Sequence, residues 1–228
     1  MSVQITFHGH ATFSFDVNGT KLVVDPFFAG NSPVALKSTD EIEANYILLT
    51  HGHVDHIADA IPLAQRTGAQ VIANWEIAGW LGGKGVSNVH AQHIGGGYNH
   101  PFGRVKMTIA FHGSGLPDGS YGGNPAGFLL SVDGKNIYIA GDTALYSDMA
   151  LIGEAGIDVA ILPIGDNFTM GPDDALRAIK YIKPKVAIPC HYNTWPPIAQ
   201  DANAWAARVE AETDTKVVVM GVEDSYEV

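Results

Sequence analysis

The chain has 228 residues, of which 46% are hydrophobic and only 16% are charged. This length and apolar content fit one sizeable domain that spans residues 1–228. The 24 acidic residues outnumber the 13 basic ones, giving a net charge of −11, and no lysine and arginine cluster is visible. Nucleic acid is therefore excluded as the expected main partner.

Cys190 is the only cysteine, so no intramolecular disulfide can form, which is typical of a reducing compartment. The opening MSVQITFHGH lacks the basic and apolar regions of a signal peptide, and no apolar run approaches the ~20 residues that span a bilayer. We therefore expect a cytoplasmic protein without membrane insertion. A homo-oligomer is compatible with the sequence.

The first third of the chain predicts a meander of three strands, VQITF, ATFSFDV and KLVVD, with Asn18-Gly19 marking a hairpin between the last two. A loop over 26–43 leads to the apolar strand ANYILLT, which ends at His51. The following HIADAIPLAQRTG predicts a helix that stops at Gly68.

The middle of the chain begins with the strand AQVIAN and the short helix WEIAGWLGGKG. The segment HIGGGYNHPFG within 86–103 is typical of a loop, and we expect His90, His93 and His100 to face solvent there. RVKMTIAFH alternates as a strand does and ends at His112, before a glycine-rich polar segment.

The second half predicts a hairpin of AGFLLSVD and KNIYIAGD, a helix over 143–156, the strand DVAILPIG and the helix PDDALRAIKYIK, with Pro172 in its first turn. The strand KVAIPCH, a helix over 199–212 and the strand KVVVMG follow. In each half strands predominate early and helices follow, which favours an α/β sandwich with mixed sheets.

Four polar segments stand just beyond the C-terminal ends of predicted apolar strands, beginning or ending at His51, His112, Asp142 and His191. This edge is where open α/β sheets usually bind ligands. The pattern therefore predicts one shared site. Cys190, next to His191 in its strand, should point to the opposite face and be buried.

HGHVDH, residues 51–56, holds four metal-binding side chains. Imidazole and carboxylate groups suit zinc, manganese or iron. His51 and His53, two apart in an extended segment, can chelate one ion, whereas Asp55 and His56 project differently and can serve a second. Burying these groups without a cation would cost several kcal/mol, so a metal site is favoured over a solvated loop.

The remaining ligands can come from the other polar segments, although a lone His112 or His191 would ordinarily be a surface histidine. We assign one metal to His51, His53 and His112, the other to Asp55, His56 and His191, and a bridging role to Asp142.

HxHxDH followed by a distant His, Asp and His resembles the signature of the metallo-β-lactamase superfamily, nearly from end to end of the chain. ITFHGHATF and CHYNTWPP are similar to segments of small bacterial and archaeal metal-dependent hydrolases related to ascorbate-6-phosphate lactonase and N-acyl-phosphatidylethanolamine phospholipase D. This resemblance implies a four-layer αββα sandwich of the α/β class, with two mixed sheets and a dinuclear site.

The resemblance also implies hydrolysis, because iron-based redox members replace the second histidine pair with acidic ligands and this chain keeps His53 and His56. A metal lowers the pKa of bound water from ~15.7 to ~7, worth about 12 kcal/mol, whereas a general base contributes about 3 to 5 kcal/mol. Our hypothesis is that hydroxide held by two zinc or manganese ions attacks the substrate, while the catalytic Asp55 orients it or receives its proton.

The expected substrate is a small molecule with an ester, lactone or amide bond. Phosphodiesterase or phospholipase D-like hydrolysis is an alternative, as is a non-catalytic metal-binding module. Seven ligands favour a site with open water positions, since structural sites are usually closed by four. His10, Ser114 and Asn193 are candidate substrate contacts by resemblance, and His10 alternatively supports a metal ligand.

Overall fold

The computed structural model describes residues 3–228, whose strands form two mixed sheets of seven strands each. The first sheet has the order β14-β1-β2-β3-β4-β5-β6. Its strands are β1 (Val3–Gly9), β2 (Thr12–Val17), β3 (Thr20–Val24), β4 (Tyr46–Leu48), β5 (Gln70–Asn74), β6 (Val89–Gln92) and β14 (Ser225–Glu227).

The second sheet has the order β13-β12-β11-β10-β9-β8-β7. Its strands are β7 (Gly97–His100), β8 (Gly103–Ile109), β9 (Ala126–Val132), β10 (Lys135–Ile139), β11 (Val159–Pro163), β12 (Val186–Cys190) and β13 (Lys216–Val217). Each sheet is antiparallel over its first strands and parallel beyond, from β3 in one and from β10 in the other. The two halves of the chain therefore repeat one arrangement.

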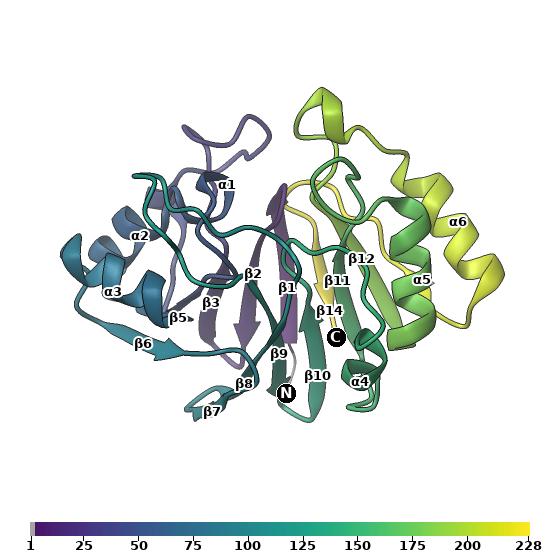
Figure 1. Ribbon diagram of the computed structural model, residues 1–228, viewed down its shortest axis with the longest axis horizontal. Helices are drawn as coiled ribbons and strands as arrows, with labels where there is room; N and C mark the ends of the chain where they lie inside the picture. The colour runs from purple at the N-terminus through teal and green to yellow at the C-terminus, as the bar shows by residue number, and fades with distance from the viewer. Residues whose placement is uncertain (1–2) are drawn as a thin grey trace.

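Helices cover the outer face of each sheet, and the four layers are seen edge-on in Figure 1. The helices are α1 (Val54–Ile57), α2 (Ala60–Thr67) and α3 (Trp75–Gly83) over the first sheet, and α4 (Met149–Gly153), α5 (Pro172–Ile182) and α6 (Ala202–Glu212) over the second. Short 3₁₀ helices lie at Thr39–Glu41 and Pro196–Ile198. The expected four-layer αββα sandwich is confirmed.

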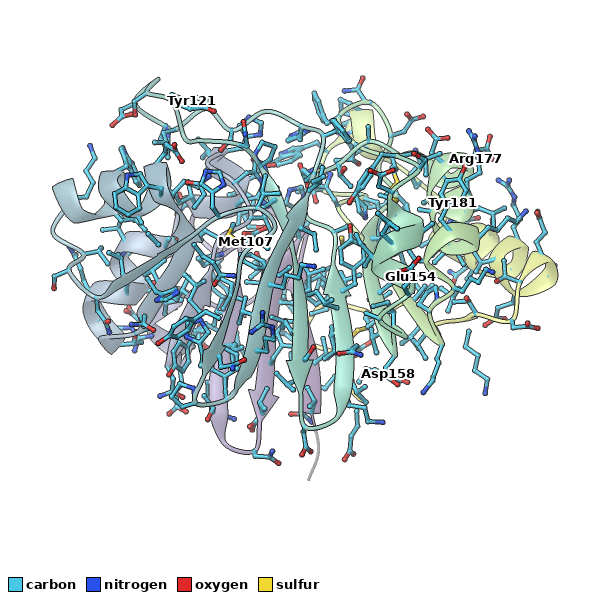
Figure 2. The ribbon with its side chains drawn as sticks, turned by 60° about the horizontal axis from the view of Figure 1, so that its bottom comes forward. Met107, Tyr121, Glu154, Asp158, Arg177 and Tyr181 are labelled. Carbon is cyan, nitrogen blue, oxygen red and sulfur yellow. The ribbon has the colours of Figure 1, made fainter. Side chains whose placement is uncertain are left out.

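Three apolar cores hold the layers together. The central core joins residues of both sheets, such as Phe13 and Phe128, because alternate side chains of each strand point inward. Met107 belongs to it and points between the sheets in Figure 2, whereas Arg177 and Tyr181 lie on the outer layer. Within residues 3–228, no helix combines the length and apolar character needed to cross a membrane.

The portion HIGGGYNHPFG, expected as a loop, contains the edge strand β7, and the edge strand β6 lies just before it. β7 (GYNH) shows no apolar and polar alternation, and β6 (VHAQ) alternates over only four residues, so periodicity gives little strand signal there. Nor does His100 face solvent as expected, since it is buried against Tyr46 and Phe102. The short edge strand β14, which pairs with β1, was not predicted either, because three residues are too few to show a periodic pattern.

The predicted helix over 143–156 is reduced to α4. The stretch before α4 uses its backbone elsewhere, because Ala144 donates to the carbonyl of Phe111 and the carbonyl of Thr143 accepts from Met170. The predicted helix over 56–68 is divided into α1 and α2, and it ends as expected at Gly68, whose φ of 72° suits glycine at a helix end.

One edge of the sandwich collects the strand ends that matter for function. β1, β3 and β4 run in one direction in the first sheet, and β8, β10, β11 and β12 share a direction in the second. Their C-terminal ends lead into the loops at the top of Figure 1, while both chain termini lie toward the bottom. The residues that follow these strands therefore meet at one edge.

Candidate metal centre

Asp142, which follows β10, lies at the centre of the predicted ligands. Its Oδ2 atom is 3.0 Å from His191 Nε2, 3.4 Å from His56 Nε2, 3.5 Å from His112 Nε2 and 4.0 Å from His51 Nε2. Groups that are up to 140 positions apart in the sequence thus converge on one carboxylate. This position is the one expected for a ligand shared by two ions.

His51, His53 and His112 form one half of the cluster, with ligand atoms within 4.8 Å of one another. His53 Nδ1 is 3.0 Å from His51 Nε2 and 3.2 Å from His112 Nε2. A neutral imidazole has one donor and one acceptor nitrogen, so three facing nitrogens cannot all satisfy one another. A cation among them would satisfy all three.

Asp55, His56 and His191 form the other half, together with His10. Asp55 Oδ2 is 3.8 Å from His56 Nε2, 3.7 Å from His191 Nε2 and 3.0 Å from His10 Nε2. The structure therefore brings together all seven residues that the sequence proposes as ligands, in the two groups expected.

The donor set fits a divalent metal because several buried atoms lack any partner in hydrogen-bond geometry. Among the described residues these include His56 Nε2, both ring nitrogens of His191 and Asp142 Oδ1. Leaving such groups unpaired costs about 1 to 3 kcal/mol each. Imidazole nitrogens and carboxylate oxygens converging without partners are the ligands that zinc and manganese take.

Burial prepares the first half of the cluster for metal binding. Desolvation holds the pKa of His51 well below its usual value and also lowers the pKa of His53 and His112. These imidazoles stay neutral, and neutral imidazole is the form that binds a metal.

Carboxylates have the opposite effect on the second half. Burial, the largest single effect, lowers the pKa of His191, but the charge of Asp142 and the close contacts of the imidazole with Asp142 and Asp55 together outweigh it and raise the pKa to about 9. Asp142 and Asp25 similarly raise the pKa of His56 despite its burial. A cation that binds there must displace these protons, so metal affinity should fall at low pH.

Asp25, which follows β3, is a site residue that sequence reasoning missed. Its Oδ2 accepts hydrogen bonds from His56 Nδ1 at 2.8 Å and Thr50 Oγ1 at 2.6 Å, and its Oδ1 accepts one from the Thr50 amide at 2.8 Å. Since the Thr50 hydroxyl proton is used in this way, the hydroxyl accepts from His51 Nδ1 at 3.0 Å. Both histidines thereby keep Nε2 free for a metal.

His10 lies behind Asp55. His10 Nε2 donates to Asp55 Oδ2, and His10 Nδ1 accepts from Thr194 Oγ1 at 2.7 Å. The imidazole is buried, packs against Trp195, and is not among the residues lining the cavity described below. His10 was expected either to contact the substrate or to support a metal ligand. This geometry matches the second role.

Three residues of the cluster and its supports, His10, Asp25 and His191, adopt left-handed backbone conformations that residues other than glycine rarely take. The φ angles are 56° for His10, 47° for Asp25 and 53° for His191. Each such residue costs on the order of 1 kcal/mol or more and persists only where its surroundings hold it. The chain thus accepts strain where it turns these side chains toward the cluster.

The cluster forms the floor of a cavity of about 540 Å³, a volume typical of small-molecule sites. The sequence gives no periodic signal for its apolar walls, because they are isolated residues. The lining residues are Phe27, His53, Val54, Asp55, His112, Asp142, Phe168, His191, Trp195 and Pro197.

The structure does not bring Ser114 or Asn193 to this cavity. Ser114 Oγ accepts from the Gly52 amide and donates to the Gly122 carbonyl, which ties the glycine-rich segment to the HGHVDH loop. Asn193 Oδ1 accepts from the Gln200 amide. The histidines of the segment 86–103 lie on or near β6 and β7, away from the edge that bears the cluster.

The family model described as the beta-lactamase superfamily domain matches residues 4–191, most of the chain. The chain belongs to the metallo-β-lactamase superfamily. The expected resemblance is therefore confirmed. All seven predicted ligands lie within the matched residues.

Relatives in this superfamily are similar along almost the whole chain. A UPF0173 metal-dependent hydrolase of Shouchella clausii is 48% identical over 215 residues, covering 92% of this chain and 94% of the relative. Another from a Geobacillus strain is 50% identical over 210 residues, covering 90% and 92%. The structure of Igni18, a metallo hydrolase from Ignicoccus hospitalis, matches with a TM-score of 0.90 and 34% identity, covering 100% and 99%.

Proposed function

We propose that this protein hydrolyses an ester, lactone or amide at a dinuclear centre of zinc or manganese. That the chain is a metal-dependent hydrolase follows from its superfamily and its relatives. The observation that carries the finer proposal is the convergence of the seven proposed ligand side chains, in two groups that share Asp142, with five of the seven lining an open cavity.

His51, His53 and His112 would hold one ion, and Asp55, His56 and His191 the other, with Asp142 between them. Such ions polarise a carbonyl oxygen and make water a nucleophile at neutral pH. Asp25 fixes the tautomer of His56 and, through the hydroxyl of Thr50, that of His51. The metal-binding nitrogens of both histidines are therefore oriented before an ion arrives.

Asp55 is the carboxylate that can act on the reacting groups. Its side chain is 24% exposed, whereas that of Asp142 is 3% exposed, and it lines the cavity. The hydrogen bond from His10 holds it there. Water adds to the carbonyl carbon, the bond to the alcohol or amine breaks, and Asp55 orients the water and passes its proton toward the leaving group.

The phosphodiesterase alternative has less support, because no arginine or lysine lines the cavity within residues 3–228 to stabilise a phosphoryl group. The non-catalytic alternative has less support because the cluster opens to a cavity rather than being closed. A single domain and a cytoplasmic location stay predictions from the sequence.

Reconstitution with zinc or manganese, followed by a panel of chromogenic esters, lactones, amides and bis-p-nitrophenyl phosphate, tests the proposal. His51→Ala and Asp142→Ala should lose bound metal, measured by elemental analysis, and should lower kcat/KM on the order of 10³-fold or more. His93→Ala, at an exposed histidine outside the cluster, is the control. A cluster variant with full metal content and full activity would contradict the assignment.

A further inference from the structure

The cavity above the metal cluster is divided into a polar floor and apolar walls. Five of its lining residues belong to the cluster, and the other five are Phe27, Val54, Phe168, Trp195 and Pro197. Among the described residues, no carboxylate, amide, hydroxyl or cationic side chain lines the cavity outside the cluster. The only polar side-chain atom of the walls is the indole nitrogen of Trp195.

Phe27 and Trp195 form one fixed wall. Their ring centroids lie 6.3 Å apart, and the buried His10 packs edge-on against both, at 5.7 Å from Phe27 and 5.0 Å from Trp195. Because His10 also binds Asp55, this wall and the polar floor share one support. An apolar group resting on the wall would therefore be held at a set distance from the cluster.

Phe168 extends from a different loop and is 55% exposed although it is a large apolar residue. Asp166 and Asn167 precede it with left-handed φ angles of 62° and 51°, and the Asp166 amide donates to the carbonyl of Met170 at 3.1 Å. Met170 is buried, which anchors the loop. The phenyl ring of Phe168 is thus held partly in water at the cavity, which costs hydrophobic free energy. An apolar ligand that covered the ring would regain this free energy.

Charge gives an independent argument. The chain has 13 lysine and arginine residues, and none lines the cavity. Several of them are paired with carboxylates elsewhere, for example Lys37 with Glu223, Lys84 with Asp118 and Lys185 with Asp158. A negative charge on the substrate away from the metals would be desolvated against the aromatic walls without a partner.

We propose that the substrate is uncharged away from its scissile bond and carries an apolar chain or ring that packs between Phe168 and the wall of Phe27 and Trp195. This inference rests on the proposed hydrolytic function and specifies the chemistry of the substrate. The floor binds the reacting group, and the walls select what is attached to it.

A matched pair of esters tests the selection in the metal-loaded protein. p-Nitrophenyl butyrate and mono-p-nitrophenyl succinate have acyl chains of equal length and differ in a terminal methyl or carboxylate. After division by each ester's rate with hydroxide alone, we expect kcat/KM for the butyrate to be at least about tenfold higher. Equal or faster cleavage of the succinate would overturn the inference.

Phe168→Ala should raise KM for the butyrate roughly three- to tenfold with unchanged metal content, because the variant removes one wall and no ligand. Tyr181→Ala is the matched control, since Tyr181 is a partly exposed aromatic residue near the far end of α5 and outside the cavity (Figure 2). An unchanged KM in Phe168→Ala would count against the inference.

A binding measurement separates this inference from the proposed hydrolysis. Saturation-transfer NMR with 4-phenylbutan-2-one, which cannot be hydrolysed, should show the strongest transfer to the phenyl protons, reduced in Phe168→Ala and kept in Tyr181→Ala. If the ketone binds in this way but no ester, lactone or amide is cleaved, the hydrolysis fails and the selection stands. If esters are cleaved but the saturation transfer to the ketone is the same in Phe168→Ala as in the wild type, the selection fails.

Discussion

Asp25 shows how a single residue outside the predicted ligands can determine the state of the cluster. Its two oxygens take three hydrogen bonds, from the imidazole of His56 and from the amide and hydroxyl of Thr50. Through that hydroxyl, Asp25 also fixes the tautomer of His51. One carboxylate thus orients a ligand in each half of the cluster.

Replacing Asp25 with alanine should lower metal affinity roughly 10- to 100-fold, because His56 and His51 would lose the partners that present Nε2. Titration of the metal-free protein with zinc against a chelating dye measures the change. Asp16→Ala, at a carboxylate of β2 that pairs with Lys21, should leave the affinity as it is. A folded Asp25→Ala protein that binds zinc as tightly as the wild type would refute this role.

The seven residues proposed as ligands could be identified from the sequence, and the residues around them could not. HGHVDH concentrates metal-binding groups in a pattern that has little structural explanation, and His112, Asp142 and His191 each follow an apolar strand. Asp25 also follows such a strand, in KLVVD, so the same rule could have found it. Phe168 could not be found in this way, because its place in the cavity depends on a loop conformation that no local pattern specifies.

At the scale of elements, the strands with alternating or continuous apolar residues were predictable, and the edges were not. The central strands β2, β9 and β11 are buried on at least one face and carry that pattern. Edge strands such as β7 have one neighbour and little core, so pairing rather than composition defines them.

Trp205 is the largest fully buried side chain beneath the outer helices of the second sheet. Trp205 of α6 is 1% exposed, belongs to the core beneath α5 and α6, and donates its indole hydrogen to the carbonyl of Pro172 at 3.0 Å. Pro172 opens α5, so this bond joins the start of one helix to the face of the next. Trp205 therefore both fills the core and positions α5 below the loop of Phe168.

Trp205→Ala should lower the free energy of unfolding by about 3 to 5 kcal/mol, from lost burial, a cavity and an unpaired carbonyl. Urea denaturation monitored by circular dichroism measures the change. Trp75→Ala removes the same side chain at a position that is 70% exposed and should cost less than about 1 kcal/mol. Equal losses in the two variants would show that α6 is not held by this contact.

In the whole molecule, the cluster of seven proposed ligands connects the two sheets. The first sheet leads into His51, His53, Asp55 and His56, and the second leads into the other three ligands, His112, Asp142 and His191. Each proposed ion would therefore be held by both halves of the chain. An ion that binds only when both sheets are in place stabilises the folded state as a whole.

Removing the metal should accordingly lower the thermal stability of the entire protein. A ligand at 100 to 1,000 times its dissociation constant stabilises the folded state by about 3 to 4 kcal/mol, and a chain of this size shifts Tm by roughly 2 to 4 °C per kcal/mol. Calorimetry of the zinc-loaded protein with and without a chelator should thus show Tm falling by roughly 6 to 16 °C.

The variant His112→Ala, which removes a proposed ligand of the second sheet alone, should lose most of this difference in Tm. His93→Ala should keep the difference, because His93 lies outside the cluster. A chelator that left Tm unchanged in protein shown to have held zinc would mean that the ions do not join the two sheets.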